Sequence, residues 1–237
     1  MKNPRVFYNI SGLFCGVDYM IKAVLFDLDG TLVNSLYDLS AAMNFCLENE
    51  GFATHDLEKY RYFIGNGIPN LIERALPEGQ KTPERIEEIK EKFLCRYSAH
   101  CCDRTAPYEG IPELIAQLKQ KGIKAAIITN KAQSMTDIII KKFFGDDFVY
   151  VLGKRADFPL KPDPSSARFV MEKLSVTPDE CLFVGDSGVD MQTALNAGIK
   201  SVGVLWGFRE REELLLNGAN YIIDAPHQLL GIIEELK

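Results

Sequence analysis

The sequence predicts an α/β fold in which a doubly wound, mostly parallel sheet carries an inserted domain made only of helices. Short apolar segments alternate with helical patterns through most of the chain. Near-continuous apolar segments are typical of parallel strands that are covered on both faces. One interval, between residues 29 and 124, holds helical patterns alone. Carboxylates and other polar groups directly follow several apolar segments, at the sheet edge where such folds bind ligands.

The predicted core strands and helices alternate along the chain. The strands cover residues 22–29, 124–130, 148–153, 181–186 and 201–207. Helices are predicted over residues 111–121, 135–144, 165–174 and 191–197, with Pro164 before one of them and Gly198 after another. A last unit has a helix over residues 210–217, a strand over residues 221–224 and a helix from Gln228. This alternation indicates βαβ units and a Rossmann-like core.

The helical interval after the first strand is predicted to form a cap domain. A crossover between parallel strands needs only about a dozen residues, so most of the interval forms a module of its own. Apolar residues follow helical spacing at Leu39, Met43, Cys46, Leu47, Ile86, Ile89, Phe93 and Tyr97. We divide the chain into a core (20–36 and 106–237), a cap (37–105) and an N-terminal extension of unknown role (1–19), for which an added edge strand is one interpretation. Hinges are expected near Leu36 and residues 108–110.

Composition limits the class of protein. With 46% hydrophobic and 25% charged residues, the chain has the balance of a soluble globular protein. A net charge of −6 without any block of Lys and Arg argues against nucleic acid as a partner, because such binding needs clustered cations. No apolar run reaches the ~20 residues of a membrane span, and six scattered cysteines indicate a reducing, cytoplasmic location. We expect a monomer or a homodimer.

Polar side chains follow the predicted strands at the ends that share one sheet edge. They are Asp27, Asp29, Thr129, Asn130, Asp186 and Asp190, together with Lys161 in the segment LKPDP. Each has a simpler interpretation: the Asp-Gly pair at 29–30 is a turn signal, Thr and Asn cap helices, and a loop lysine is often solvated. Because the carboxyl ends of parallel strands meet at one edge, we instead expect these groups to share a site.

Converging carboxylates repel each other unless a cation or a proton joins them. Mg²⁺ is the cation that suits oxygen ligands together with a substrate phosphate. Lys161, Thr129 and the backbone N–H groups around Gly30 and Thr31 are donors suited to phosphoryl oxygens. The sequence therefore predicts phosphoryl transfer, with one acid as nucleophile and another as proton carrier.

These residues carry a resemblance to a known family. The segments DLDGT, TN, KPDP and GDSGVD, within residues 22–207, resemble the four motifs of the haloacid-dehalogenase-like phosphohydrolase superfamily. DGTLVNS, IGNGIPNLIERAL, PYEG, TNK and GVLWGF are similar to stretches of its phosphoglycolate phosphatase branch. The true dehalogenases of the superfamily lack the second acid of the first motif, so Asp29 indicates phosphate chemistry.

The resemblance implies a role for each matching residue. Asp27 would be the nucleophile, and Asp29 would protonate the leaving alcohol and later activate water. Mg²⁺ would be held by the carboxylates of Asp27 and Asp186 and by the backbone carbonyl of Asp29. The phosphoryl oxygens would be held by Thr129, Asn130, Lys161 and the backbone at Gly30, and Asp190 would support the metal site from behind.

The helical insert resembles the cap of this branch, a lid that closes over the site and excludes water. Gly65-x-Gly67 follows a helical stretch and lacks the third glycine of a dinucleotide fingerprint, so we reject a dinucleotide-binding role for it. It is either a loop whose Pro69 opens the next helix or a segment that helps to select the leaving group through Asn66 and Gly67. Arg74 either reaches a substrate carboxylate or lies at the surface.

The leading prediction is a Mg²⁺-dependent phosphatase that acts on a small phosphorylated metabolite, with 2-phosphoglycolate favoured. Pyrophosphate or nucleotide hydrolysis, phosphosugar mutase activity and phosphonate cleavage use the same core and stay open. A protein of another class, which binds phosphate for regulation without turnover, is the remaining alternative.

Overall fold

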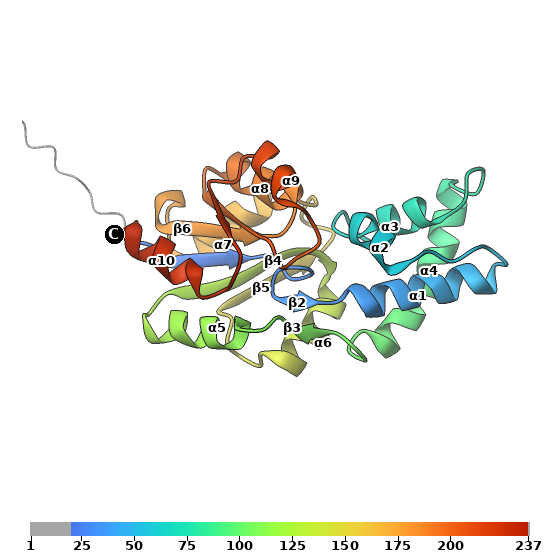
Figure 1. Ribbon diagram of the computed structural model, residues 1–237, viewed down its shortest axis with the longest axis horizontal. Coiled ribbons are helices and arrows are strands. Elements are labelled where there is room, and N and C mark those ends of the chain that lie inside the picture. The colour runs from blue at the N-terminus through green and yellow to red at the C-terminus, as the bar shows by residue number, and fades with distance from the viewer. Residues whose placement is uncertain (1–19, 237) are drawn as a thin grey trace, which may run out of the picture.

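The computed structural model describes residues 20–236, and its centre is a six-stranded parallel sheet with the order β5–β4–β1–β6–β7–β8 (Figure 1). The strands are β1 (Ala23–Phe26), β4 (Lys124–Ala132), β5 (Tyr150–Lys154), β6 (Cys181–Gly185), β7 (Lys200–Val204) and β8 (Tyr221–Ile223). From β1 the chain adds β4 and β5 on one side and then returns to add β6 on the other. The predicted doubly wound sheet is confirmed, and its topological switch point lies beside β1.

Helices cover both faces of the sheet. Side chains of α5 (Ile111–Gln120), α6 (Gln133–Phe143) and α10 (Gln228–Glu235) share one hydrophobic core with the sheet, and those of α7 (Ser165–Leu174) and α8 (Gly188–Ala197) share another. The turn η1 (Pro178–Glu180) precedes β6, and α9 (Arg211–Leu216) contacts α8. In β1, Val24 and Phe26 enter the first core while Ala23 and Leu25 enter the second. This two-sided burial explains why the strand is apolar at every position.

Two differences from the predicted bounds affect the site. The helix expected from residue 191 begins at Gly188, because Ser187 caps it and Asp190 reciprocates. Asp190 Oδ2 accepts hydrogen bonds from Ser187 N (3.1 Å) and Ser187 Oγ (2.7 Å). Strand β4 continues to Ala132, so Thr129 and Asn130 lie in extended backbone and do not cap α6, whose N-cap residue is Ala132.

Four helices form the cap beyond the carboxyl edge of the sheet, to the right in Figure 1. They are α1 (Leu36–Asn49), α2 (Leu57–Phe63), α3 (Ile68–Ala75) and α4 (Pro83–His100). The cap has a hydrophobic core of its own, in which Tyr60, Ile72 and Phe93 are fully buried. The core residues Met135 and Phe208 pack against it. The predicted insertion of an all-helical cap is confirmed.

The chain crosses between core and cap twice, and the two crossings lie together. The short strands β2 (Val33–Asn34) and β3 (Ala106–Pro107) pair antiparallel. Beside them the buried carboxylate of Asp38 accepts hydrogen bonds from the backbone N–H of Arg104 (3.0 and 3.1 Å) and of Thr105 (2.8 Å). The hydroxyl of Thr105 also donates to it, at 2.7 Å. One acid on α1 thus fixes the chain where it leaves the cap.

The predicted edge strand within residues 1–19 lies outside the described residues. Within residues 20–236, none of the helices combines the length and the apolar character that crossing a membrane requires.

Candidate active site

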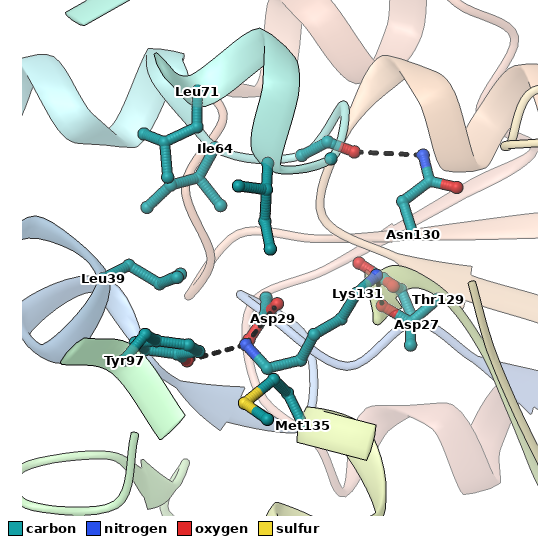
Figure 2. Close-up of a pocket in the computed structure, with 13 residues that line it drawn as sticks. Asp27, Asp29, Leu39, Ile64, Leu71, Tyr97, Thr129, Asn130, Lys131 and Met135 are labelled. Atoms are coloured by element: carbon teal, nitrogen blue, oxygen red, sulfur yellow. Dashed lines mark hydrogen bonds and ion pairs between the residues drawn. The ribbon is translucent and has the colours of Figure 1, made fainter. Parts of the chain in front are cut away.

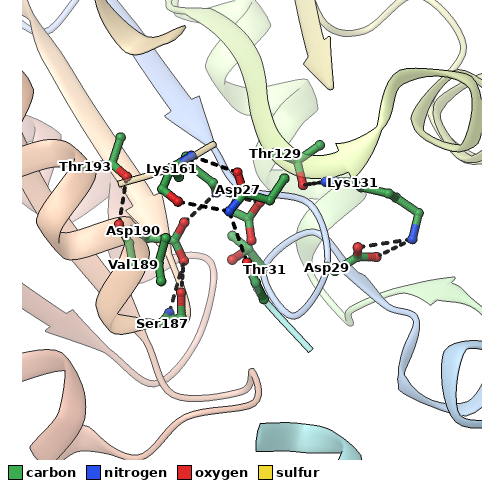
Figure 3. Close-up of polar contacts among 12 residues, drawn as sticks. Asp27, Asp29, Thr31, Thr129, Lys131, Lys161, Ser187, Val189, Asp190 and Thr193 are labelled. Atoms are coloured by element: carbon green, nitrogen blue, oxygen red, sulfur yellow. Dashed lines mark hydrogen bonds and ion pairs between the residues drawn. The ribbon is translucent and has the colours of Figure 1, made fainter. Parts of the chain in front are cut away.

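Three acids come together at the sheet edge, and Figure 3 shows two of them, Asp27 and Asp190, beside Lys161. Asp27 directly follows β1, Asp186 directly follows β6, and Asp190 lies in the first turn of α8. Each is at least nine-tenths buried, and ligand oxygens of the three carboxylates lie within 4.8 Å of one another. The topology brings these residues together because β1 and β6 are neighbours with matching direction.

Lys161 supplies a positive charge to this cluster. Its Nζ lies 2.6 Å from Asp190 Oδ1 and 2.8 Å from Asp27 Oδ1, and the side chain is 3% exposed. Burial alone lowers the pKa of Lys161, but the charges of Asp190 and Asp27 outweigh it and raise that pKa above the ordinary value. Lys161 is therefore a charged donor at the sheet edge.

The carboxylates remain in excess over this one cation. Burial, together with the charge of Asp190, raises the pKa of Asp27 to about 6 against the opposing effect of Lys161. Burial, followed by the charges of Asp190 and Asp27, raises the pKa of Asp186 well above its usual value. Three acids beside a single lysine create a demand for a further cation, or for protons in its absence.

The oxygen atoms that remain available fit Mg²⁺. Asp27 Oδ1 is buried, and its polar neighbour among the described residues is Lys161 Nζ, with which it forms an ion pair at 2.8 Å. Asp186 Oδ2 accepts from Phe208 N at 2.7 Å, while its Oδ1 has only a long contact of 3.5 Å to the Thr31 hydroxyl. Both oxygens of Asp190 are already engaged, by Lys161 and Ser187. Asp27 and Asp186 are thus the side chains suited to ligate the metal, and Asp190 orients its neighbours.

Gly30 contributes space to the site. A Cβ at Gly30, which has φ of +88°, would overlap the carboxylate of Asp186, and a Cβ at Gly207 would overlap the same residue. The expected phosphate-binding N–H groups are used elsewhere: Gly30 N donates to Val33 O (2.9 Å) and Thr31 N to Leu28 O (3.3 Å). Both N–H groups are engaged within the turn, and their contact with a phosphoryl group stays a prediction.

Asn130 and Thr129 lie at the end of β4, beside the acids. Asn130 Oδ1 accepts from Lys161 N at 2.8 Å, and its Nδ2 donates to Lys161 O and to Gly65 O of the cap, both at 3.2 Å. The amide is therefore committed to holding the Lys161 loop and the cap. Thr129 Oγ1 accepts from Lys131 N (3.3 Å), and its own hydrogen has no acceptor within residues 20–236, so it can donate to a ligand.

Asp29 lies in a different environment from Asp27. Its carboxylate accepts from Ser35 Oγ (2.5 Å) and from Lys131 Nζ (3.0 and 3.1 Å). Lys131 Nζ also donates to Tyr97 Oη of α4 at 2.7 Å. Burial, with Asp29 nearby, raises the pKa of Tyr97 well above its usual value, so the phenol stays protonated. The two acids of the first motif are each paired with a different lysine.

Sequence reasoning missed Lys131 and Tyr97. Lys131 directly follows Thr129 and Asn130 in the segment TNK, so its position after the strand was a usable signal. Tyr97 ends a series of apolar residues at helical spacing, and only its hydroxyl distinguished it from an ordinary core residue.

The site opens into a pocket between core and cap (Figure 2). The core contributes Asp27, Asp29, Thr129, Asn130, Lys131 and Met135 to its lining. The cap contributes Leu39, Ile64, Gly65, Gly67, Ile68, Leu71 and Tyr97. Among the three cap residues expected to select the substrate, only Gly67 lines this pocket. Arg74 donates to the backbone carbonyls of Tyr62 and Phe63 on an exposed face, and Asn66 lies outside the lining, where its carbonyl accepts from Asn70.

Comparison with known proteins places these observations in a family. The sequence model described as haloacid dehalogenase-like hydrolase matches residues 24–204. A phosphoglycolate phosphatase of Pseudomonas putida is 33% identical over 213 residues, which cover 88% of this chain and 78% of the relative. An N-acetylmuramic acid 6-phosphate phosphatase of Pseudomonas aeruginosa is 29% identical, with 90% and 95% covered.

Solved structures give the same result for the fold. The crystal structure of a predicted phosphoglycolate phosphatase from Haemophilus somnus superposes with a TM-score of 0.83 at 30% identity. The match covers 90% of this chain and 97% of that one. The similarity therefore includes both the sheet and the helical cap.

Proposed function

The chain belongs to the haloacid dehalogenase-like hydrolase family, in its phosphoglycolate phosphatase-like branch, and from that premise we propose that it is a Mg²⁺-dependent phosphatase of small phosphate monoesters, with 2-phosphoglycolate the favoured substrate. That it is a phosphatase follows from the relatives. The metal, the intermediate, the residue roles and the substrate are the proposal.

The observation that carries the proposal is the buried group of three acids with Lys161. An excess of carboxylates suits a divalent cation, and the adjacent lysine suits the phosphate that such a cation would accompany. Mg²⁺ held by Asp27, Asp186 and the backbone carbonyl of Asp29 would neutralise charge on the phosphoryl group. Lys161 and the hydroxyl of Thr129 would hold the phosphoryl oxygens, and Asn130 would hold the Lys161 loop in place.

Asp27 and Asp29 would divide the chemistry between them. Asp27 attacks phosphorus, the bond to the leaving alcohol breaks, and an aspartyl-phosphate forms. Asp29 gives its proton to the leaving oxygen and then takes a proton from the water that hydrolyses the acyl phosphate. The two acids have separate surroundings, since Asp27 faces Lys161 whereas Asp29 faces Lys131 and Ser35.

The test is phosphate release from a panel of phosphorylated metabolites, with and without Mg²⁺. Wild type is compared with Asp27→Asn, and Asp157→Asn serves as a control because Asp157 is exposed and pairs only with its neighbour Arg155 among the described residues. We expect Mg²⁺-dependent release by wild type and the control, and none by Asp27→Asn. An acid-quenched reaction should also yield a peptide that contains Asp27 and carries the mass of one phosphoryl group.

The panel also separates the alternatives. Release only from nucleotides or pyrophosphate, isomerisation of a phosphosugar without release, or cleavage of a phosphonate would each point to another activity of the same core. Binding of phosphate and Mg²⁺ without turnover of any compound would favour a regulatory binding protein and refute the proposal.

A further inference from the structure

We propose that Lys131 and Tyr97 together bind a carboxylate of the substrate next to its ester oxygen, so that the site selects phosphate esters of 2-hydroxy carboxylic acids. The inference rests on the proposed phosphatase function and adds to it the residues that recognise the leaving group. Neither residue belongs to the acid cluster that holds the phosphoryl group.

The two side chains form a buried donor pair that spans both domains (Figure 2). Lys131 comes from β4 of the core and Tyr97 from α4 of the cap. The Lys131 side chain is 4% exposed and Tyr97 is 1% exposed, yet both line the pocket. Their polar atoms are 2.7 Å apart. A carboxylate bound here would contact core and cap at once.

Each group keeps a donor for a ligand. The lysine ammonium has three hydrogens, and within residues 20–236 its Nζ contacts both oxygens of the Asp29 carboxylate (3.0 and 3.1 Å) and Tyr97 Oη. When one N–H is shared by the two oxygens of Asp29, a third hydrogen is left for a ligand. Tyr97 Oη accepts the hydrogen bond from Lys131, and no acceptor for its own hydrogen is found among the described residues. Two donors side by side match the two oxygens of a carboxylate.

The position of the pair fixes where the carboxylate must be on the substrate. Lys131 Nζ lies 3.0 Å from Asp29 Oδ1. Asp29, as the proposed acid, must approach the ester oxygen to ~2.6–3.2 Å. In the phosphate ester of a 2-hydroxy acid, a single carbon separates the ester oxygen from the carboxylate. The ester oxygen can then face Asp29 while the carboxylate faces Lys131. A carboxylate separated from the ester oxygen by more carbons would lie beyond Lys131 and Tyr97.

The rest of the pocket favours a leaving group without further hydroxyls. Its walls are the apolar side chains of Leu39, Ile64, Ile68, Leu71 and Met135. Buried hydroxyls without hydrogen-bond partners are unfavourable, so these walls discriminate against sugar phosphates and nucleotides. Lys131 is the one cationic side chain among the lining residues of the described chain. No other lining residue can neutralise a substrate carboxylate there.

The competing interpretation is that Lys131 serves only to orient Asp29. That role would affect every substrate equally, because each one needs the same proton transfer. Recognition of a carboxylate would affect only substrates that carry one. The two interpretations therefore differ in selectivity and not in overall activity.

The experiment compares 2-phosphoglycolate with ethyl phosphate, in which a methyl group replaces the carboxylate. For Lys131→Met we expect kcat/KM to fall ~10- to 100-fold more on 2-phosphoglycolate than on ethyl phosphate, mainly through KM. Tyr97→Phe keeps the ring and should show the same bias at about tenfold. Lys119→Met is the control, because Lys119 is exposed and pairs with Asp147 at the surface. Wild type should also prefer 2-phosphoglycolate to the ester of 3-hydroxypropionate.

The outcomes separate this inference from the function on which it rests. Equal losses on both substrates in Lys131→Met and Tyr97→Phe would overturn the inference and leave the phosphatase intact. A wild type that does not prefer 2-phosphoglycolate to ethyl phosphate would do the same. Failure of wild type to release phosphate from any ester, an aryl phosphate included, would overturn both. If Lys131→Met does not fold, Tyr97→Phe decides by the same criterion.

Discussion

Arg61 of the cap and Arg209 of the core each donate hydrogen bonds to the backbone of the segment that carries the other. Arg209 donates to the carbonyls of Arg61 and Ile64, the latter at 2.9 Å, and Arg61 Nη2 donates to Gly207 O at 2.8 Å. The next residue, Phe208, donates its N–H to Asp186. This paired contact joins helix α2 to the loop that orients a proposed metal ligand.

Replacing Arg209 should therefore weaken the contact between cap and core. For Arg209→Met we expect kcat/KM to fall about tenfold, because the two hydrogen bonds that Arg209 donates to the cap are lost. Such bonds are worth ~0.5–1.5 kcal/mol each, and water partly replaces them. Steady-state kinetics measures the fall, and limited proteolysis should cut the chain faster near residues 33–36 and 104–107. Arg211→Met is the matched control, since Arg211 is half-exposed and only approaches Asp224 at 3.8 Å. Unchanged kinetics in Arg209→Met would mean that cap position does not depend on this contact.

Gly207→Ala should disable the site without unfolding the protein. The added Cβ would overlap both Asp186 and the carbonyl oxygen of Gly30, so the carboxylate must move from its position. We expect kcat to fall by at least about 100-fold, as misplacement by roughly 1 Å does in other sites. Gly231→Ala is the control, because Gly231 lies in α10 with open space around its Cα. It should keep full activity and gain about 0.5–1 kcal/mol of stability. Normal activity in Gly207→Ala would refute the close-packing argument.

Without Mg²⁺, Asp186→Asn should be more stable than wild type at pH 7.5. The pKa of Asp27 is raised to about 6 and that of Asp186 is raised well above its usual value. The folded state therefore binds more protons than the unfolded state, and this contribution to stability is present at low pH and is lost as pH rises through the folded pKa values. Removing one acid relieves the repulsion. Urea unfolding in EDTA should be measured from pH 5 to 8. The free energy of unfolding of Asp186→Asn should exceed that of wild type by less as pH falls.

Mg²⁺ should make wild type more stable than Asp186→Asn. The ion binds the ionised cluster in the folded state, so wild type should gain stability with Mg²⁺ concentration, and the gain should grow with pH. Asp186→Asn should gain far less, while Asp157→Asn should respond as wild type does. An equal gain in all three proteins would place the ion elsewhere.

Asp38→Asn should lower stability more than a typical surface change. The acid accepts four hydrogen bonds from Arg104 and Thr105 while 4% exposed. Asparagine has one acceptor oxygen and brings an amide that meets the same donors, so we expect a loss of about 1–3 kcal/mol in the free energy of unfolding. Asp56→Asn, at the exposed start of α2 where no side-chain cap is formed, should change it by less than about 0.5 kcal/mol. Similar values for the two variants would contradict the role of Asp38.

The sequence determined the architecture because its signals are local. Continuous apolar segments such as the one ending at Phe26 specify buried parallel strands, and the long helical interval specifies an insert. Once the strands are parallel, their carboxyl ends must meet, so the meeting of Asp27 with Asp186 followed from chain order alone. Lys161 joined them for the same reason, from a loop that returns to that edge.

Tertiary structure decided which groups are free and which are engaged. The donors of Gly30 are consumed by its own turn, Asn130 is committed to Lys161, and Arg74 lies on an exposed face. The contact of Lys131 with Tyr97 joins residues 34 positions apart in different domains. No periodicity encodes such a pair, because it depends on how the cap packs on the core, and that packing is a sum of many long-range contacts. The sequence thus specified where the chemistry lies, whereas only the folded chain specified which atoms remain to perform it.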